Sequence, residues 1–189
     1  MNINFDIDTY KTKFTGGARQ YLFFAYFTFP YSIGNSVIPY LVKSTSIPDS
    51  SLEEIVVPYP GISFKMAGTR TYGDWQISFN VDEDGVLLHG FHNWHDLIYD
   101  SDTHSQISAN NYMRNQTLFL LDGNGASTEQ ITLYGAWPKS VGAVGLDYAT
   151  SDIATMDVTF SYQYYKFETL SSNILWSSVL NKLSESLLE

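Results

Sequence analysis

The stretch TRTYGDWQISFNV, residues 69–81, joins a glycine-containing lead-in to a strict alternation of apolar and polar residues. Such an alternation predicts a β-strand with one buried face. We expect a second strand over residues 62–68 and a turn made by Gly68 and Gly73 between the two. The apolar positions of the alternating segment are Trp75, Ile77, Phe79 and Val81.

Strand patterns continue on both sides of this stretch. The sequence TMDVTFSYQYYKF (155–167) alternates most regularly, and DGNGAS (122–127) is typical of a hairpin turn between strands over 117–121 and 129–137. Gly34 and Asn35 predict another turn within a hairpin over residues 31–40. Further strands are expected over 19–29, 37–45 and 52–61, a polar loop over 100–116 and a glycine-rich connection over 138–154.

Two segments have helical rather than strand periodicity. Residues 83–99 predict one amphipathic helix, preceded by the acidic residues Asp82 to Asp84. Residues 169–189 predict a C-terminal amphipathic helix, which either folds back on its own sheet or is lent to a neighbouring subunit. We therefore expect a mainly antiparallel β domain over residues 1–168, with an irregular arm over 1–18, and a helical extension.

The composition narrows the possible functions. The net charge of −10 disfavours stable binding to nucleic acid, and the absence of cysteine excludes disulfides and thiolate metal sites. The acidic N-terminus lacks the pattern of a signal peptide, and no apolar run is long enough to span a membrane. Charged residues make up only 16% of the chain, which favours a surface that contacts other protein.

The sequence contains no convincing catalytic or metal-binding motif. His89, His92 and His95 lie on a predicted helix, but no HExxH motif is present and we expect them on its polar face. Nucleophile-elbow and phosphate-loop patterns are also missing. We therefore expect no enzymatic activity, no cofactor and no metal. The aromatic residues expected in the core are Trp75, Trp94, Trp137 and Phe160.

Three blocks, in this order and spacing, resemble one known family. They are ARQYLFFAYF (18–27), PYPGISFKMAGTRTYGDWQISFNVDED (58–84) and ITLYGAWPKSVGAVGLDYATSDIATMDVTFSYQYYKF (131–167). Together they resemble the tail tube proteins of contractile-tailed bacteriophages, which are related to the tube proteins of type VI secretion and other contractile injection systems. The resemblance covers roughly residues 18–168.

The resemblance implies two packed β-sheets with a flanking helix, assembled into hexameric rings whose strands join into one barrel. Stacked rings would form a tube in the virion tail, built in the host cytoplasm, through which DNA passes without specific binding. The implied partners are further copies of the chain, the tail sheath, a baseplate tube-initiator protein and a tail terminator protein.

Two sets of residues follow from this resemblance. The lumen candidates, whose faces could instead look outward toward a sheath, are Ser78, Asn80, Asp82, Asp157, Thr159, Ser161 and Gln163. Arg70 would pair with an acid, either across a subunit boundary or within the chain. The residues expected to shape the fold and the subunit interface are Gly68, Arg70, Gly73, Asp74, Trp75, Pro138, Gly142 and Asp147.

Two departures from the family pattern keep other interpretations open. The hairpin over residues 31–40 is longer than the family's usual turn, and the terminal helix lies beyond the usual end. They favour, as an alternative, a baseplate-adjacent tube-initiator protein of the same fold. A hypothesis of another class is a carbohydrate-binding β-sandwich, in which exposed aromatic residues would stack on sugars.

Overall fold

A computed structural model describes residues 6–14, 17–31 and 38–169 of the chain. The chain divides into two compact units. Unit 2 comprises residues 25–118 and 131–168, and unit 1 contains the N-terminal segment up to Phe24 and residues 119–130. The expected C-terminal helix and the turn of the 31–40 hairpin lie outside the described residues. Within the described part, no helix is long and apolar enough to cross a membrane.

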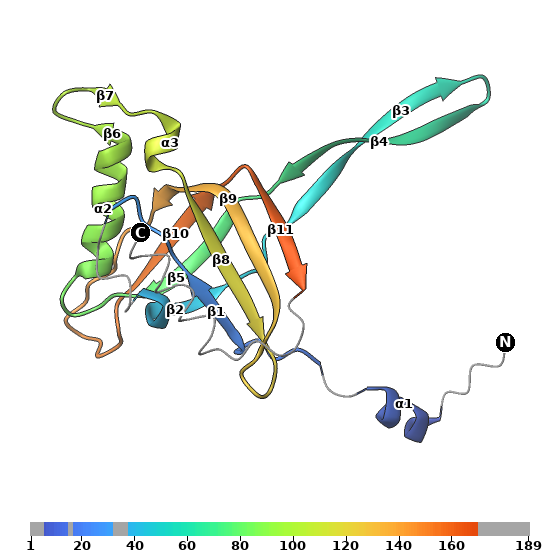
Figure 1. The fold of residues 1–189 in the computed structure, drawn as a ribbon, viewed down its shortest axis with the longest axis horizontal. Coiled ribbons are helices and arrows are strands. Elements are labelled where there is room, and N and C mark those ends of the chain that lie inside the picture. Colours follow the sequence, from blue (N-terminus) through green and yellow to red (C-terminus); the bar gives the residue numbers. More distant parts are fainter. Residues whose placement is uncertain (1–5, 15–16, 32–37, 170–189) are drawn as a thin grey trace. The chain divides into compact units, whose positions relative to one another are not determined.

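The fold is mainly β and antiparallel, as the sequence predicts (Figure 1). One sheet has the strand order β1-β8-β9-β10-β5-β2, with β11 also pairing with β9. Its strands are β1 (Phe23–Tyr26), β2 (Val42–Thr45), β5 (Trp75–Asn80), β8 (Arg114–Leu121), β9 (Ser127–Val141), β10 (Thr155–Ser161) and β11 (Tyr164–Thr169).

The core of unit 2 is built on the buried faces of β5 and β10. Trp75 lies opposite Phe160 in the antiparallel register, and both side chains are completely buried. Phe27, which follows β1, stacks on both, with ring centroids 5.9 Å from Trp75 and 6.0 Å from Phe160. The sheet is therefore curved, so that Phe27, which follows the edge strand β1, contacts the internal strands β5 and β10. Burying each such side chain contributes about 1.5–3 kcal/mol.

Helix α2 (Val86–Ile98) closes this core, and it confirms the helix expected over residues 83–99. Its side chains Leu87, Phe91 and Trp94 are completely buried. Asp82 stabilises the start of the helix, since its carboxylate accepts hydrogen bonds from the backbone N–H groups of Val86 (2.7 Å) and Leu87 (3.0 Å). These N–H groups have no partner within the helix, so an acidic residue here is favourable.

The expected strand pairing around residues 62–81 is wrong. Strand β4 (Ile62–Tyr72) pairs with β3 (Ser50–Tyr59) in a separate two-stranded hairpin, whereas β5 pairs with β10 and β2. The turn of this hairpin lies at Pro60 and Gly61, and the φ of Gly61 is 81°. Proline followed by a glycine with positive φ is typical of a type II turn.

Other local expectations are corrected as well. Residues 7–13 form helix α1 (Ile7–Lys13) in the arm that was expected to be irregular. Ile38–Leu41 is a 3₁₀ helix rather than strand, because Pro39 has no N–H to donate to a sheet. The expected loop over 100–116 contains β7 (Ser105–Gln106), α3 (Ala109–Tyr112) and the start of β8, after β6 (Tyr99–Asp100).

The turn between β8 and β9, in unit 1, is confirmed at residues 122–126. The carboxylate of Asp122 accepts hydrogen bonds from the backbone N–H groups of Ala126 (2.9 Å) and Asn124 (2.8 Å). These bonds lower the pKa of Asp122, since they favour its charged form. The side chain thus supports the tight turn that the sequence DGNGAS predicts.

The long strand expected over residues 155–167 is broken into β10 and β11. The break lies at Tyr162 and Gln163, where the Gln163 N–H donates to the Tyr134 carbonyl at 3.0 Å. Beside it, β9 bends at Gly135, whose φ is 63°. A Cβ at Gly135 would also lie 3.0 Å from the Gln163 side chain. The two neighbouring strands therefore change direction at the same level.

Gly142 offers a test of how closely the end of β9 packs on β10. Its N–H donates to the Asp157 carbonyl at 2.7 Å, and a Cβ there would lie only 2.8 Å from the same oxygen. We expect Gly142→Ala to lower the free energy of unfolding by about 1–3 kcal/mol, as overpacking does elsewhere. Urea denaturation measures this difference.

Gly145 supplies the matched control, because no atom lies within 4 Å of the Cβ that alanine would add there. Gly145→Ala should change the unfolding free energy by no more than about 0.5 kcal/mol. Equal effects of the two substitutions would contradict a close backbone approach at Gly142.

Candidate functional site

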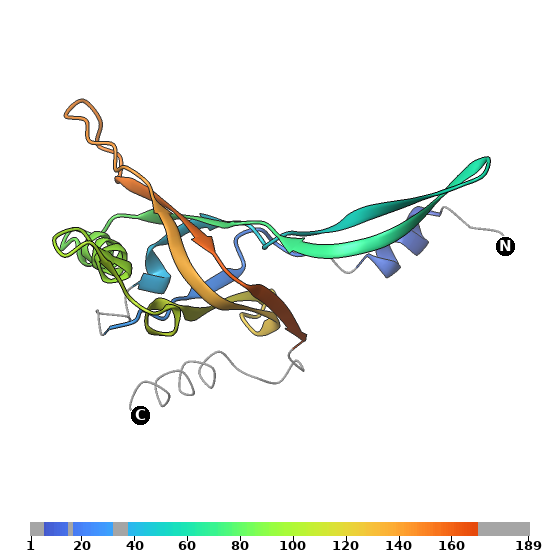
Figure 2. The same cartoon turned by 90° about the horizontal axis from the view of Figure 1, so that it is seen from above.

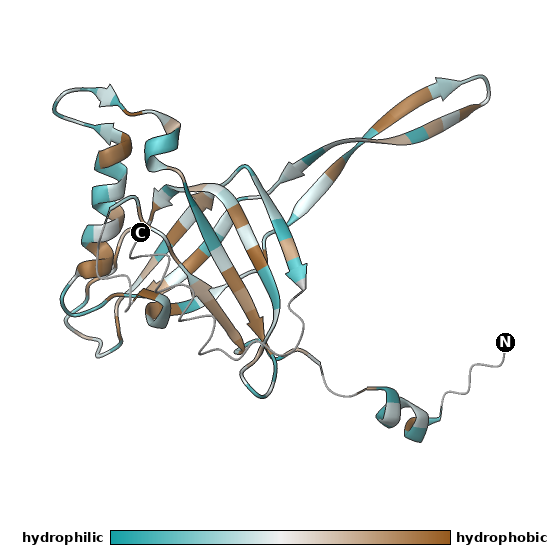
Figure 3. Cartoon of the chain, in the orientation of Figure 1, coloured by the Kyte–Doolittle hydropathy of each residue, from teal (hydrophilic) through white to brown (hydrophobic). Residues whose placement is uncertain are grey.

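The hairpin formed by β3 and β4 has one fully apolar face. Its register places Tyr59 opposite Ile62, Val57 opposite Phe64 and Ile55 opposite Met66. All six side chains are exposed, from 41% for Val57 to 70% for Tyr59. Figure 3 shows the corresponding hydrophobic bands along the hairpin. We call these six residues the hairpin face.

The opposite side of the same hairpin is more polar. Val56 lies opposite Lys65, whose ammonium group is 3.0 Å from the carboxylate of Glu54. Since successive side chains of a strand point to opposite sides, the hairpin is amphipathic. Such an exposed, contiguous apolar face is typical of a surface that another protein covers.

The base of the hairpin is held by Arg70 and tyrosines. The Arg70 guanidinium donates to Ser50 Oγ at 2.8 and 3.2 Å and lies over the rings of Tyr72 (5.2 Å) and Tyr165 (5.7 Å). Tyr165 also donates its hydroxyl to Ser50 Oγ at 3.2 Å. Within the part of the chain that the structure describes, Arg70 has no acidic partner. The intrachain salt bridge weighed from the sequence is therefore not present there.

Tyr162 packs in the same cluster, with ring centroids 6.1 Å from Tyr72 and 6.2 Å from Tyr165. Its hydroxyl is buried and finds no hydrogen-bond partner among the described residues. Burial, with smaller contributions from neighbours such as Tyr165, raises its pKa to about 12. Tyr162 therefore attaches β10 to the hairpin base by ring packing rather than by hydrogen bonding.

Gly68 and Gly73, which were expected to form a turn, each leave room for a close neighbour. Gly68 lies within β4, beside a register shift between Leu52 and Glu54, so its expected role in a turn is wrong. A Cβ at Gly68 would lie 3.1 Å from the Glu53 carbonyl and 3.0 Å from the side chain of Ile55. Gly73 does lie between β4 and β5, and a Cβ there would collide with the carboxylate of Asp49.

The other expected architectural residues lie around the ends of β5, β9 and β10. Asp74 forms an ion pair with Lys139 at 2.6 Å, and Trp75 donates its indole N–H to the Ser46 carbonyl at 2.8 Å. Pro138 is buried opposite Phe160. Asp147 accepts a hydrogen bond from the Ala149 N–H at 2.9 Å, in the loop between β9 and β10.

The polar side of the main sheet brings together most of the lumen candidates. The register of β5 and β10 pairs Asn80 with Thr155, Ser78 with Asp157 and Gln76 with Thr159. The Ser78 hydroxyl donates to the Asp157 carboxylate. Ser161 continues the same face of β10, because it alternates with the buried residues of that strand.

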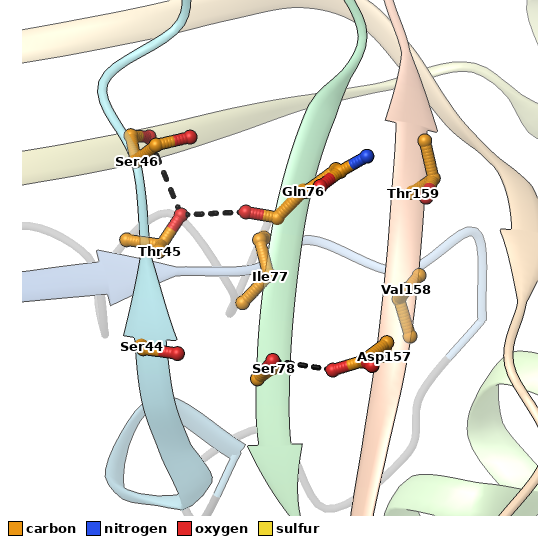
Figure 4. Close-up of a pocket in the computed structure, with 9 residues that line it drawn as sticks. All are labelled: Ser44, Thr45, Ser46, Gln76, Ile77, Ser78, Asp157, Val158 and Thr159. Carbon is orange, nitrogen blue, oxygen red and sulfur yellow. Dashed lines mark hydrogen bonds between the residues drawn. The ribbon is translucent and has the colours of Figure 1, made fainter.

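Strand β2 extends this polar face into a shallow depression (Figure 4). Thr45 donates its hydroxyl to the Gln76 carbonyl at 3.0 Å. Apart from Ile77 and Val158, the lining residues have hydroxyl, amide or carboxylate side chains. We call the following residues the polar face: Ser44, Thr45, Ser46, Gln76, Ser78, Asp157 and Thr159.

Two lumen candidates lie apart from this polar side of the main sheet. Asp82 follows β5 and binds the N-terminus of α2 through both carboxylate oxygens. Gln163 lies at the break between β10 and β11, and its side chain is exposed. Both residues were predicted to share this side of the sheet because the alternation of apolar and polar residues continues beyond the ends of β5 and β10.

The histidines do not form a metal site in the part that the structure describes. His89 and His92 are exposed, as expected for the polar face of a helix. His95 is half-buried and donates from Nε2 to the Pro138 carbonyl at 3.0 Å. No group of side chains suited to a metal ion is found among the described residues. Of the expected core aromatics, Trp137 is only half-buried.

Sequence reasoning missed the hairpin face. The signal was present, because apolar residues alternate on both sides of Pro60 and Gly61. The sequence analysis paired residues 62–68 with 74–81 instead. The apolar residues of β3 and β4 were therefore not recognised as one face. A turn at Pro60–Gly61 and a turn at Gly68–Gly73 are both compatible with the local sequence.

Comparisons with known proteins agree with this fold. The family model described as "Phage tail tube protein" matches residues 9–168. The tail tube protein of Serratia phage KSP90 is 33% identical over 129 residues, which cover 67% of this chain and 71% of that protein. The tail tube protein of Enterobacteria phage T4 is 24% identical, covering 66% of this chain and 78% of that protein.

Solved structures show the same fold in contractile injection systems. A chain of the PVC sheath–tube complex in the extended state superposes with a TM-score of 0.62 and 20% identity, covering 83% of this chain and 95% of that one. A chain of the anti-feeding prophage tube-terminating cap gives a TM-score of 0.63 and 18% identity, covering 82% and 93%.

The family match over most of the described chain is decisive. It extends over residues 9–168 and agrees with the antiparallel sheet. The chain belongs to the phage tail tube protein family and is a structural tail tube subunit of a contractile phage tail or injection system, not an enzyme.

Proposed function

We propose that six copies of this chain form a ring, that rings stack into a tube, and that DNA passes through the tube. The observation that carries this proposal is the hairpin face. All six of its apolar side chains remain exposed, although unit 2 has a well-packed aromatic core. Burying each of them against another copy would contribute up to about 1.5–3 kcal/mol.

The polar face is the part of the sheet that we assign to the lumen. Asp157 is its only ionisable side chain, and the remainder are hydroxyl or amide groups. DNA binds proteins mainly through phosphate contacts with lysine and arginine. Without such cations the polar face offers the phosphates only neutral hydrogen bonds from hydroxyl and amide groups, and Asp157 repels them. A sheath-binding surface would instead be expected to have an apolar centre.

The composition of the polar face does not support the carbohydrate-binding hypothesis. Stacking on a sugar ring requires an exposed aromatic side chain in the depression, and none of the lining residues is aromatic. The exposed aromatic residues of the hairpin face, Tyr59 and Phe64, lie among aliphatic neighbours. That arrangement suits contact with protein.

The remaining expected residues shape the subunit in this proposal. We assign Gly68, Arg70, Gly73 and Asp74 to the attachment of the hairpin, and Trp75, Pro138, Gly142 and Asp147 to the sheet and its loops. The sheath, a tail terminator and a baseplate protein are the proposed partners, because similar folds occur in the sheath–tube complex, the cap and the anti-feeding prophage baseplate.

Replacing an apolar residue of the hairpin face by a charged one tests the assembly proposal. Phe64→Glu places a carboxylate in the hairpin face, and we expect it to abolish tube formation while the subunit stays folded. Val56→Glu is the matched control, because Val56 is similarly exposed (53% against 61%) but lies on the polar side, opposite Lys65. Negative-stain electron microscopy and light scattering measure assembly, and circular dichroism measures folding.

Normal tubes from a folded Phe64→Glu variant would overturn the role of the hairpin face. Tube length carries separate information. Long tubes from the unmodified chain support a main tube subunit, whereas single rings that do not grow would support the baseplate-adjacent alternative.

A second prediction concerns the lumen. Thr159→Lys adds one cation per subunit to the polar face, so a ring of six would present a belt of positive charge to passing phosphates. We expect particles with this variant to assemble but to eject DNA more slowly, and added salt should restore part of the rate because it screens the contacts. Ejection from purified particles can be followed with a DNA-binding dye.

Asn124→Lys provides the same change in charge at a residue that is not part of the polar face, in the exposed turn between β8 and β9. Its ejection rate should equal that of the unmodified particles. Unchanged ejection from well-assembled Thr159→Lys particles would remove the polar face from the lumen.

A further inference from the structure

The hairpin of β3 and β4 joins the main sheet through two short connections, residues 46–49 and 73–74. Among the described residues its strands pair only with each other, and in Figure 2 they extend away from the main sheet as an isolated strand pair. Between the two connections, the Gly73 N–H donates to the Asp49 carbonyl at 3.3 Å. A two-stranded hairpin is only marginally stable on its own in water. Its direction relative to the sheet therefore depends on the contacts at this base.

Arg70 links both strands of the hairpin to β11 of the main sheet. Its guanidinium lies 5.2 Å from the ring centroid of Tyr72, on the same strand, and 5.7 Å from that of Tyr165, on β11. Ser50, the first residue of β3, accepts hydrogen bonds from Arg70 and from the Tyr165 hydroxyl. The side chains of Arg70 and Tyr165 therefore hold the beginning of β3 and the end of β4 together against β11.

The tyrosine of this link is itself held in place by other rings. Tyr165 contacts Tyr72 and Phe167 edge to face, each with ring centroids 5.4 Å apart, and it packs against Tyr162 at 6.2 Å. Tyr162 is buried, and β11 is paired with β9. The Tyr165 ring thus has a fixed position in the sheet, and it can fix the position of a guanidinium that stacks on it.

The chemistry of the link requires an arginine rather than any cation. A guanidinium is planar, so it can stack on aromatic rings while it donates two N–H groups to one acceptor, whereas the ammonium of lysine is a strongly hydrated point charge. Within the described ranges, Arg70 has no carboxylate partner. Its position is therefore set by stacking and hydrogen bonds, and not by an ion pair.

We propose that Arg70 and Tyr165 form a clamp that fixes the direction of the hairpin in the free subunit, before assembly begins. The inference rests on the proposed function and adds that the hairpin is preorganised for it. A segment that is already fixed does not have to be ordered on binding, so the entropy cost of association is lower. Loosening the clamp should therefore raise the subunit concentration that assembly requires, while unit 2 stays folded.

The absence of cysteine from the chain allows two spin labels to be attached at chosen positions. Ser63→Cys places one label near the turn of the hairpin and Asn93→Cys places the other on α2, and both residues are exposed. Pulsed electron–electron double resonance measures the distribution of label distances in single subunits, below the concentration at which light scattering detects assembly. We expect a narrow distribution from the labelled chain and a several-fold broader one after Arg70→Ala.

Lys65→Ala is the matched control, because it removes the other cation of β4, which pairs with Glu54 inside the hairpin at 3.0 Å. It should leave the width of the distribution unchanged. Arg70→Lys keeps the charge but should broaden the distribution, because lysine cannot stack as a plane. Tyr165→Leu removes the clamp from the side of the sheet, and adding it to Arg70→Ala should have little further effect because the two residues act as a unit. Circular dichroism checks that each variant is folded.

Tube formation, followed by light scattering without the labels, measures the consequence for assembly. We expect Arg70→Ala to require a several-fold higher subunit concentration than Lys65→Ala. A broader distribution of label distances without such a difference would overturn the role of the clamp in assembly.

The outcomes separate this inference from the function on which it rests. A broad distribution from the labelled chain without further change, or equal widths for Arg70→Ala and Lys65→Ala, would overturn the clamp and leave the proposed function intact. A narrow distribution from Arg70→Lys would also overturn it, because the charge alone would then hold the hairpin. If the unmodified chain forms no rings or tubes, the proposed function fails, whereas the label distances in single subunits still decide whether the clamp exists.

Discussion

The antiparallel register between β5 and β10 is the constraint on which the rest of the structure depends. It sets Trp75 against Phe160 on the buried side and Ser78 against Asp157 on the other. Phe27 and the apolar side of α2 then cover the buried side. A shift of one residue would exchange the two sides of a strand and place polar residues in this aromatic core.

Close backbone approaches tie the peripheral segments to this strand pair. Gly142 lets the end of β9 reach the Asp157 carbonyl, and Gly73 leaves room for Asp49 beside the start of β5. At the hairpin base, Arg70 joins Ser50 to the rings of Tyr72 and Tyr165. The hairpin is thereby attached to β10 and β11 at its base, while its apolar face remains open along the rest of its length.

The distribution of apolar residues distinguishes this chain from a self-sufficient domain. The core already contains large aromatic side chains at full burial, yet the hairpin face keeps further apolar side chains in water. Exposed apolar patches of this kind mark interaction surfaces in soluble proteins. The physical cost of leaving them uncovered is what drives the assembly that we propose.

The sequence by itself determined the features that depend on neighbouring residues: the alternation of β5 and β10, the helix over residues 86–98, the turn at residues 122–126 and the separation of buried from polar faces. The family resemblance was also readable, since three sequence blocks carried it. Tertiary structure decided which strands pair, that Gly68 is needed for a close approach rather than a turn, and that Asp82 binds the start of α2. Pairing and close approach join residues distant in the chain, so they depend on packing energies that local periodicity does not contain.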